Sequence, residues 1–169
     1  MKELTLDLVN ELFRYDKETG DLIRKVTVGS TGKAGNKAGS LRVDGYVQTR
    51  LNGKGYLNHR IIFLMHNGYL PPCLDHIDTN RSNNRIENLR PATISQNSYN
   101  AGIRKDNKSG VKGVTWHVGT GKWQVTVRRG GVKKYFGIYK TISEAEIVAH
   151  KAREQLHGEF VNHGVCEEF

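Results

Sequence analysis

The chain has 169 residues and is basic, with a formal net charge of +9 and an isoelectric point near 9.6. Its length allows one domain or two small ones, and no apolar run is long enough to span a bilayer. Because the first residues carry no signal peptide, we expect a soluble cytoplasmic protein. Cys73 and Cys166 lie far apart in the sequence, which argues against a disulfide framework and against a structural zinc site.

The positive charge is concentrated in one segment. Residues 101–140 hold ten lysines and arginines against one acid, Asp106, so this segment accounts for the whole net charge. Concentrated lysine and arginine are typical of a nucleic-acid partner, because these side chains displace counterions from phosphates. The alternative is a solvated basic face that serves only solubility.

The first seventy residues read as short helices and strands separated by turns. Apolar spacing predicts a helix over residues 4–14 and a second helix that begins at His59 and stops at Asn67-Gly68. Between them we expect a strand at residues 22–26, a glycine-rich loop at 29–39, and strands at 40–60 that turn at Asp44-Gly45 and Asn52-Gly53.

The segment that follows Pro71-Pro72 is unusually polar. Residues 74–90 read "LDHIDTNRSNNRIENLR", which is too polar for a core and too rich in asparagine for a good helix. The two prolines favour an extended strand, so we expect a strand, a polar loop and a second short strand. Thr93-Ile94-Ser95-Gln96 then matches a capping box that begins a helix.

The last third of the chain predicts a second domain. Residues 101–108 read as a linker, and residues 122–128 alternate strictly, with Trp123, Val125 and Val127 on one face. Flanking strands give a three-stranded antiparallel sheet, and a capping box at Ser143–Glu146 begins an alanine-rich helix that packs on it. We therefore predict an α+β protein with domains at 1–100 and 109–163 and a tail at 164–169.

The Asp-His pair suits phosphodiester hydrolysis. A histidine can deprotonate water near neutral pH, and a hard ion such as Mg²⁺ takes oxygen ligands from a carboxylate and an amide. On an extended strand the side chains of Asp75 and His76 point to opposite sides. One can then hold the metal while the other faces the attacking water, and an asparagine on the following helix can supply a second metal ligand.

Residues 74–100 resemble the HNH nuclease motif in the variant common among phage and intron-encoded homing endonucleases. The resemblance rests on Asp-His, Glu-Asn-Leu-Arg and Gln-Asn, with "YDKETGDLIRK" and "GYLNHRIIFLMHNGYLPP" upstream. It implies a ββα-metal (His-Me finger) domain with one divalent ion, Mg²⁺ or Mn²⁺. By position it implies that Asp75 and Asn97 hold the metal, that His76 is the general base and that Asn88 braces the loop. Many family members have histidine at position 97, and the asparagine here points away from Zn²⁺.

Other polar residues of this region receive weaker assignments. Asn80, Asn83 and Asn84 are expected to form turns, because asparagine tolerates left-handed backbone and bonds to its own main chain. We expect structural roles for His59 and His66, although either could reach the active site or a phosphate. Of the nearby arginines Arg81, Arg85 and Arg90, Arg85 is the favoured phosphate ligand.

Residues 109–160 resemble the Apetala/ethylene-response-factor type of DNA-binding domain, in Gly-Val near the start, Tyr-Phe-Gly after the third strand, and the alanine-rich helix. In that family the sheet enters the major groove of double-stranded DNA. Trp116 and Trp123 are expected in the core, and Arg128 and Gln124 can read guanine and adenine. Strand alternation selects the DNA-facing residues Lys112, His117, Lys122, Gln124, Thr126, Arg128, Lys133 and Tyr135.

The combined prediction is a metal-dependent, site-preferring DNA endonuclease of the phage or intron homing type, active in a bacterial or phage-infected cell. One active site per chain predicts a monomer that nicks one strand, leaving a 5′-phosphate and a 3′-hydroxyl as the resemblance implies. The alternative is a DNA-binding regulator that uses the nuclease domain only as a scaffold. An RNA-binding protein is less favoured, because neither domain shows a platform of stacking aromatic residues.

Overall fold

The computed structural model describes residues 4–29 and 32–164. The chain divides into two compact units between Pro91 and Ala92. Cys166, most of the expected tail and two residues of the glycine-rich loop lie outside the described residues, and the thiol of Cys73 is free. Within the described part of the chain, no helix combines the length and apolar character that crossing a bilayer requires. Helices and strands are mixed in both units, as the α+β prediction expects.

The first helix is shorter than expected. α1 spans Leu6–Leu12 and begins after Thr5, whose hydroxyl accepts a hydrogen bond from the backbone N–H of Leu8. The predicted continuation to residue 14 is wrong, because Phe13 leaves the helix and begins strand β1 (Phe13–Asp16). β1 pairs antiparallel with β2 (Asp21–Arg24). Because of this pairing, Phe13 and Arg14 belong to a strand, although helical spacing alone would have placed them in α1.

A three-stranded antiparallel sheet follows, with the order β3-β4-β5. The strands span Ser40–Leu41, Val47–Leu51 and Lys54–Leu57. The predicted turns are confirmed: Gly45 has φ of 84°, and Asn52 and Gly53 have φ of 50° and 79°. Positive φ at both central residues, as at Asn52 and Gly53, is what a two-residue hairpin of this type requires.

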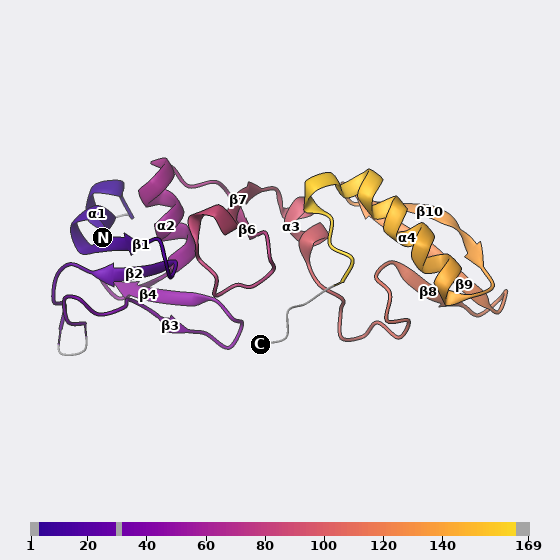
Figure 1. Ribbon diagram of the computed structural model, residues 1–169, viewed down its shortest axis with the longest axis horizontal. Coiled ribbons are helices and arrows are strands. Elements are labelled where there is room, and N and C mark those ends of the chain that lie inside the picture. The colour runs from indigo at the N-terminus through magenta and orange to yellow at the C-terminus, as the bar shows by residue number, and fades with distance from the viewer. Residues whose placement is uncertain (1–3, 30–31, 165–169) are drawn as a thin grey trace. The chain divides into compact units, whose positions relative to one another are not determined.

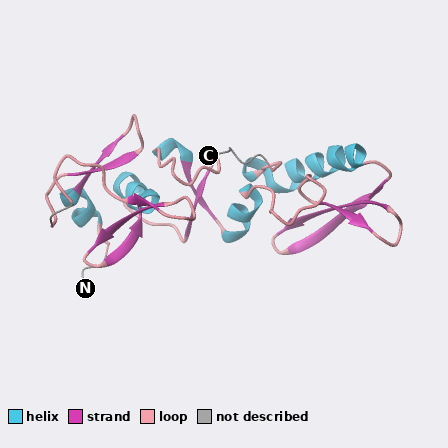
Figure 2. Ribbon diagram, turned by 90° about the horizontal axis from the view of Figure 1, so that it is seen from below, coloured by secondary structure: helices cyan, strands magenta, loops and turns pink. Residues whose placement is uncertain are grey.

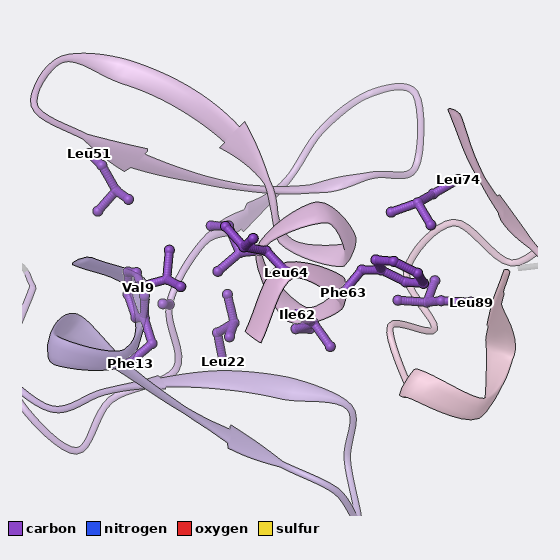
Figure 3. Close-up of a cluster of buried hydrophobic side chains, with 11 residues drawn as sticks. Val9, Phe13, Leu22, Leu51, Ile62, Phe63, Leu64, Leu74 and Leu89 are labelled. Atoms are coloured by element: carbon purple, nitrogen blue, oxygen red, sulfur yellow. The ribbon is translucent and has the colours of Figure 1, made fainter. Parts of the chain in front are cut away.

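Helix α2 spans Asn58–Asn67 and ends at Gly68, which adopts the left-handed conformation predicted for this position. Its buried side chains connect two parts of the first unit. In Figure 3 Phe63 points toward Leu74 and Leu89, while Val9, Phe13 and Leu22 lie around the other side of the helix. Packing against α2 therefore fixes the strands that carry Leu74 and Leu89.

These strands are β6 (Cys73–His76) and β7 (Leu89–Ala92), which pair with each other and are followed by α3 (Ile94–Asn100). The polar residues between them form a loop that ends in a single 3₁₀ turn, Ile86–Asn88. The capping box of α3 is confirmed, with Thr93 and Gln96 bonding each other's backbone N–H. The expected order of strand, loop, strand and helix is therefore present.

Helix α3 belongs to the second compact unit. The ring of Tyr99 stacks on that of His157 at a centroid distance of 4.1 Å, and its hydroxyl accepts a hydrogen bond from the Gly130 N–H. The ammonium group of Lys112 donates to the carbonyl oxygens of Tyr99 and Ala101. These contacts tie the end of α3 to the sheet-and-helix part of the chain.

The second unit contains a three-stranded sheet of order β10-β9-β8. Figures 1 and 2 show these strands beside a long helix. The strands span Val114–His117 (β8), Lys122–Arg129 (β9) and Val132–Tyr139 (β10), as the alternation predicted. Helix α4 (Ile142–His157) lies along one face of this sheet, and a 3₁₀ turn, Gly158–Phe160, follows it. Ala145 and Ala149 of α4 are buried against Val114 and Val125, so small side chains let the helix approach the sheet closely.

Two expectations for this unit need correction. The capping box of α4 is formed by Thr141 and Glu144, because Thr141 is extended while Ser143 is already helical. Trp123 packs on the core as predicted, but Trp116 is half exposed and meets Trp123 edge-on, at a centroid distance of 5.0 Å. The core position expected for Trp116 is therefore wrong.

Candidate active site

Asp75 and His76 are the last two residues of β6, and both are buried, with 3% and 4% of their surface exposed. Adjacent side chains on a strand point to opposite sides, so the two groups have different neighbours. The carboxylate of Asp75 meets the Arg90 guanidinium, while the imidazole of His76 meets Asn84 and two aromatic rings.

The hydrogen bond to His76 comes from Asn84. His76 Nε2 lies 3.2 Å from the amide oxygen of Asn84, a side chain that is only 3% exposed. An amide oxygen only accepts hydrogen bonds, so this contact favours the tautomer of the neutral ring that carries its hydrogen on Nε2. The sequence assigned Asn84 to a turn, and nothing in its spacing distinguished it from Asn80 or Asn83.

Burial lowers the pKa of His76 below its ordinary value of 6.5. The Asn84 hydrogen bond and the negative charges of Asp78 and Asp75 raise the pKa, and the charge of Arg81 lowers it, but burial is the largest of these influences. The imidazole is therefore neutral and able to accept a proton at neutral pH.

Asn88 joins the two ends of the polar loop. Its amide nitrogen donates to the Asp78 carboxylate and to the Asn83 carbonyl, at 2.9 and 2.8 Å, and its oxygen accepts from the Asp78 N–H. The Asp78 carboxylate also accepts from the Asn80 N–H and the Asn83 amide. Asp78 is thus the acceptor at the centre of the loop, a role that the sequence reading missed.

Asp75 is held by an arginine. Nε of Arg90 donates a hydrogen bond to one carboxylate oxygen of Asp75 at 2.9 Å, and Nη2 forms an ion pair with the same oxygen at 2.8 Å. Arg90 comes from β7, so this ion pair also links the two paired strands. Arg90 was one of three arginines considered for binding phosphate, and in this structure its guanidinium is engaged with Asp75.

The second predicted metal ligand lies on a different unit. Asn97 is half-buried on α3, in the second compact unit, whereas Asp75 and His76 belong to the first. Binding of one ion by Asp75 and Asn97 together stays a prediction. Among the described residues, no three histidine, cysteine, aspartate or glutamate side chains group as a metal site. One carboxylate and one amide still suit a hard ion that keeps several waters, as Mg²⁺ does.

The arginines of the loop differ in their partners. Arg85, favoured from the sequence, donates from Nη2 to the Glu18 carbonyl oxygen at 2.7 Å, in the turn between β1 and β2. Arg81 donates from Nη1 to the Asp44 carbonyl oxygen at 2.9 Å and lies over the Tyr46 ring. Arg85 therefore fixes the loop to a neighbouring turn, and Arg81 lies beside the rings that contact His76.

His59 contacts the predicted base. Its ring meets the His76 ring edge-on at a centroid distance of 4.9 Å, and the Tyr46 ring lies 5.3 Å from it. Burial, together with the positive charges of His76 and Arg60, lowers the pKa of His59 to about 3. His66, by contrast, bonds to the Ile62 carbonyl and packs on Tyr15.

The strand register brings most of the predicted DNA-facing residues of the second unit together. Cross-strand partners share a face of a sheet, and the pairs are His117 with Lys122, Thr126 with Tyr135, and Arg128 with Lys133. Gln124 follows the same alternation along β9. Lys112 lies outside the strands, and its ammonium group is engaged with backbone carbonyls of α3.

Comparison with known proteins defines the class of the site. Residues 56–99, from the end of β5 through most of α3, match the family described as HNH endonuclease. The chain is 37% identical to Protein 3.8 of Escherichia phage T7 over 98 residues, which cover 56% of this chain and 78% of that protein. It is 33% identical over 110 residues to an uncharacterized HNH endonuclease of Acanthamoeba polyphaga mimivirus, covering 64% of this chain and 56% of that protein.

The protein therefore carries an HNH endonuclease domain and belongs to the same family as Protein 3.8 of phage T7. HNH nucleases generally use a divalent metal ion, and the relatives named above are viral. No solved structure matches this chain. The comparisons do not extend to an Apetala-type domain, so that resemblance stays a prediction.

Proposed function

We propose that this protein is a metal-dependent homing-type DNA endonuclease that prefers particular sites and uses His76 as its general base. The observation that carries the proposal is the buried His76 imidazole with Nε2 against the Asn84 oxygen. This contact favours the tautomer in which Nδ1 is the basic nitrogen, as the proposed role requires. The HNH endonuclease domain supports the reaction class.

In the proposed reaction, Nδ1 of His76 takes a proton from water. The water oxygen forms a bond to phosphorus while the bond from phosphorus to the 3′-oxygen breaks. The products are a 5′-phosphate and a 3′-hydroxyl, whose oxygen takes its proton from solvent. As His76 becomes charged, its Nε2–H bond to Asn84 becomes a charge-assisted hydrogen bond and stabilises the imidazolium.

Asp75 and Asn97 are the proposed ligands of one Mg²⁺ or Mn²⁺ ion. Such an ion supplies positive charge for the phosphate and for the leaving oxygen. Asn88 acts through the loop, because its three side-chain hydrogen bonds hold Asp78 and Asn83 and so fix the chain on either side of Asn84.

The outer face of the second sheet is the proposed DNA-binding surface. It presents Arg128 and Lys133 side by side, with Tyr135 59% exposed next to Thr126. Helix α4 packs on the opposite face and so does not cover this one. The segment that contains this face carries the net charge of the chain, as phosphate binding requires.

A relaxation assay with supercoiled plasmid tests the proposal. We expect the purified protein to convert a plasmid that carries its site to open circles in Mg²⁺ or Mn²⁺, and to leave it supercoiled in EDTA. Open circles without linear product would agree with a monomer that cuts one strand. An intact plasmid in both metals, together with a gel shift of the same DNA, would instead favour a DNA-binding regulator.

A further inference from the structure

Arg81 is an exposed arginine whose guanidinium group is nevertheless held at two points. Nη1 donates to the Asp44 carbonyl oxygen at 2.9 Å, and the central guanidinium carbon lies 5.0 Å from the centroid of the Tyr46 ring. Both contacts come from the turn between β3 and β4. A planar guanidinium fixed in this way needs little further ordering to bind a ligand.

The same turn also contacts the stem of Arg81. A side-chain carbon built on Gly45 would lie 3.7 Å from Arg81 Cβ and 3.8 Å from its Cδ, so the turn backbone runs along the side chain. The position of the guanidinium is therefore set by the β3–β4 turn as well as by the loop that carries Arg81.

Tyr46 connects Arg81 to the active site. The Tyr46 ring contacts Arg81 and also lies 5.8 Å from the His76 ring and 5.3 Å from the His59 ring. Only one ring therefore separates a fixed guanidinium from the proposed base. Within the described part of the chain, Asp44 is the one hydrogen-bond partner of the Arg81 side chain, which leaves further N–H groups for a ligand.

The other two arginines near this loop contact different parts of the protein. Arg85 donates to the Glu18 carbonyl in the β1–β2 turn, and Arg90 is hydrogen-bonded and ion-paired to the Asp75 carboxylate. Arg81 is the one of the three that combines exposure with a position beside the rings around His76. Guanidinium N–H groups match the oxygens of a phosphate in spacing and charge.

We propose that Arg81 binds a non-bridging oxygen of the phosphate that is cut, with Tyr46 and the Asp44 carbonyl holding it in place. Arg81 is then a catalytic residue, since it contacts the reacting group and offsets the negative charge that develops there. This inference rests on the proposed nuclease function and identifies the group that receives the substrate phosphate.

The test is single-turnover cleavage of a duplex that carries one mapped cut site, at saturating protein. We expect Arg81→Ala to lower the rate about 100-fold, the usual effect of removing one donor to a developing negative charge. Arg81→Lys, which keeps the charge but not the planar fork, should fall between Arg81→Ala and wild type. Arg50→Ala removes one exposed arginine from β4 in the same unit and should cleave at the wild-type rate.

Free guanidinium ion provides a second readout. It should restore part of the rate of Arg81→Ala and leave the rate of Arg50→Ala unchanged. If wild type cleaves and Arg81→Ala cleaves equally fast, or if Arg81→Ala weakens only DNA affinity, this inference is overturned and the nuclease function stands. If wild type cleaves no DNA in any divalent metal, both proposals fail.

Discussion

Asn84 is the residue of the polar loop whose side chain contacts the proposed base, His76. It lies eight positions after His76, and its amide oxygen favours one tautomer of the imidazole. A residue that holds a histidine in this way resembles the outer partner of a metal-bound imidazole, whose loss typically lowers metal affinity or activity about 10- to 100-fold. The asparagines of the loop thus divide into those that build it, such as Asn88, and one that contacts His76.

Substitution of Asn84 tests this role. We expect Asn84→Ala to lower the single-turnover cleavage rate about 10- to 100-fold, because Nε2 loses its acceptor and the ring can turn or change tautomer. Asn84→Asp keeps an acceptor oxygen at the same position and should retain more activity than Asn84→Ala. Equal rates for wild type and Asn84→Ala, with unchanged circular dichroism, would remove Asn84 from the mechanism.

The lowered pKa of His59 predicts how the free energy of unfolding of the first unit depends on pH. Its pKa is about 3 in the folded protein and near 6.5 in an unfolded chain, so the unfolded chain binds one more proton between these values. Stability is therefore complete above pH 6.5 and falls as the pH drops below it. Between pH 7 and pH 5 we expect His59 alone to contribute a loss of about 2 kcal/mol in the free energy of unfolding, in addition to any loss from His76, whose pKa burial also lowers.

Denaturant unfolding in EDTA measures this loss. His59→Phe keeps a buried ring but cannot take up a proton, so the first unit should lose about 2 kcal/mol less than wild type over the same pH range. Both tryptophans, Trp116 and Trp123, belong to the second unit, so their fluorescence is an internal reference while circular dichroism follows the whole chain. The same pH dependence in wild type and His59→Phe would contradict the assignment.

Among the elements, the turn between β1 and β2 supports the loop that carries Asn84. Gly20 has φ of 78°, and a side-chain carbon there would lie 2.7 Å from the Arg85 nitrogen and 3.0 Å from the Asn84 carbonyl carbon. The Arg85 guanidinium binds the Glu18 carbonyl across the same contact. The backbone of residues 84 and 85 is therefore held against this turn.

Gly20→Ala should disturb both stability and cleavage, and Gly53→Ala is its matched control. Both glycines have φ near 80°, so alanine meets a similar backbone penalty at each, but nothing lies within 4 Å of the added carbon at Gly53. We expect Gly20→Ala to lower the free energy of unfolding by about 2 kcal/mol more than Gly53→Ala. Equal losses in the two variants, measured by denaturant unfolding, would show that the contact with residues 84 and 85 is unimportant.

The sequence predicted those elements that local chemistry determines. Asn52-Gly53, Gly68 and the box at Thr93 fix their turns and helix ends through backbone conformation and neighbouring side chains. Phe13 was misassigned because it follows helical spacing, and only pairing with the distant Arg24 makes it a strand residue.

Three contacts of the candidate site that the sequence missed join different segments of the chain. These contacts are Asn84 with His76, Arg85 with Glu18, and Arg81 with Asp44. No local pattern encodes which of several asparagines or arginines makes such a contact. The residue types of the site could therefore be predicted from the sequence, and their individual roles could not.

At the scale of the whole molecule, the candidate catalytic residues and the concentrated positive charge lie in different units. The first unit contains Asp75 and His76, and the strongly basic segment lies in the second. This division predicts that cleavage and much of the DNA affinity respond to different substitutions.

Lys133 and Lys151 provide a matched pair for testing the binding face. Lys133 lies on the outer face of the sheet beside Arg128, whereas Lys151 is exposed on α4, which packs on the other face. Lys133→Ala should weaken DNA binding and reduce the slope of log affinity against log salt by about one, while Lys151→Ala should change neither. A larger effect from Lys151→Ala, in a filter-binding titration at several salt concentrations, would place the DNA elsewhere.

The most direct test of the central claim is the cleavage rate of His76→Ala in Mg²⁺ with and without added imidazole. If His76 is the general base, its removal should lower the single-turnover rate about 100- to 10,000-fold, and free imidazole should restore part of that rate. DNA affinity should remain close to that of wild type, because binding is assigned to the second unit. A His76→Ala variant that cleaves at the wild-type rate would contradict the claim.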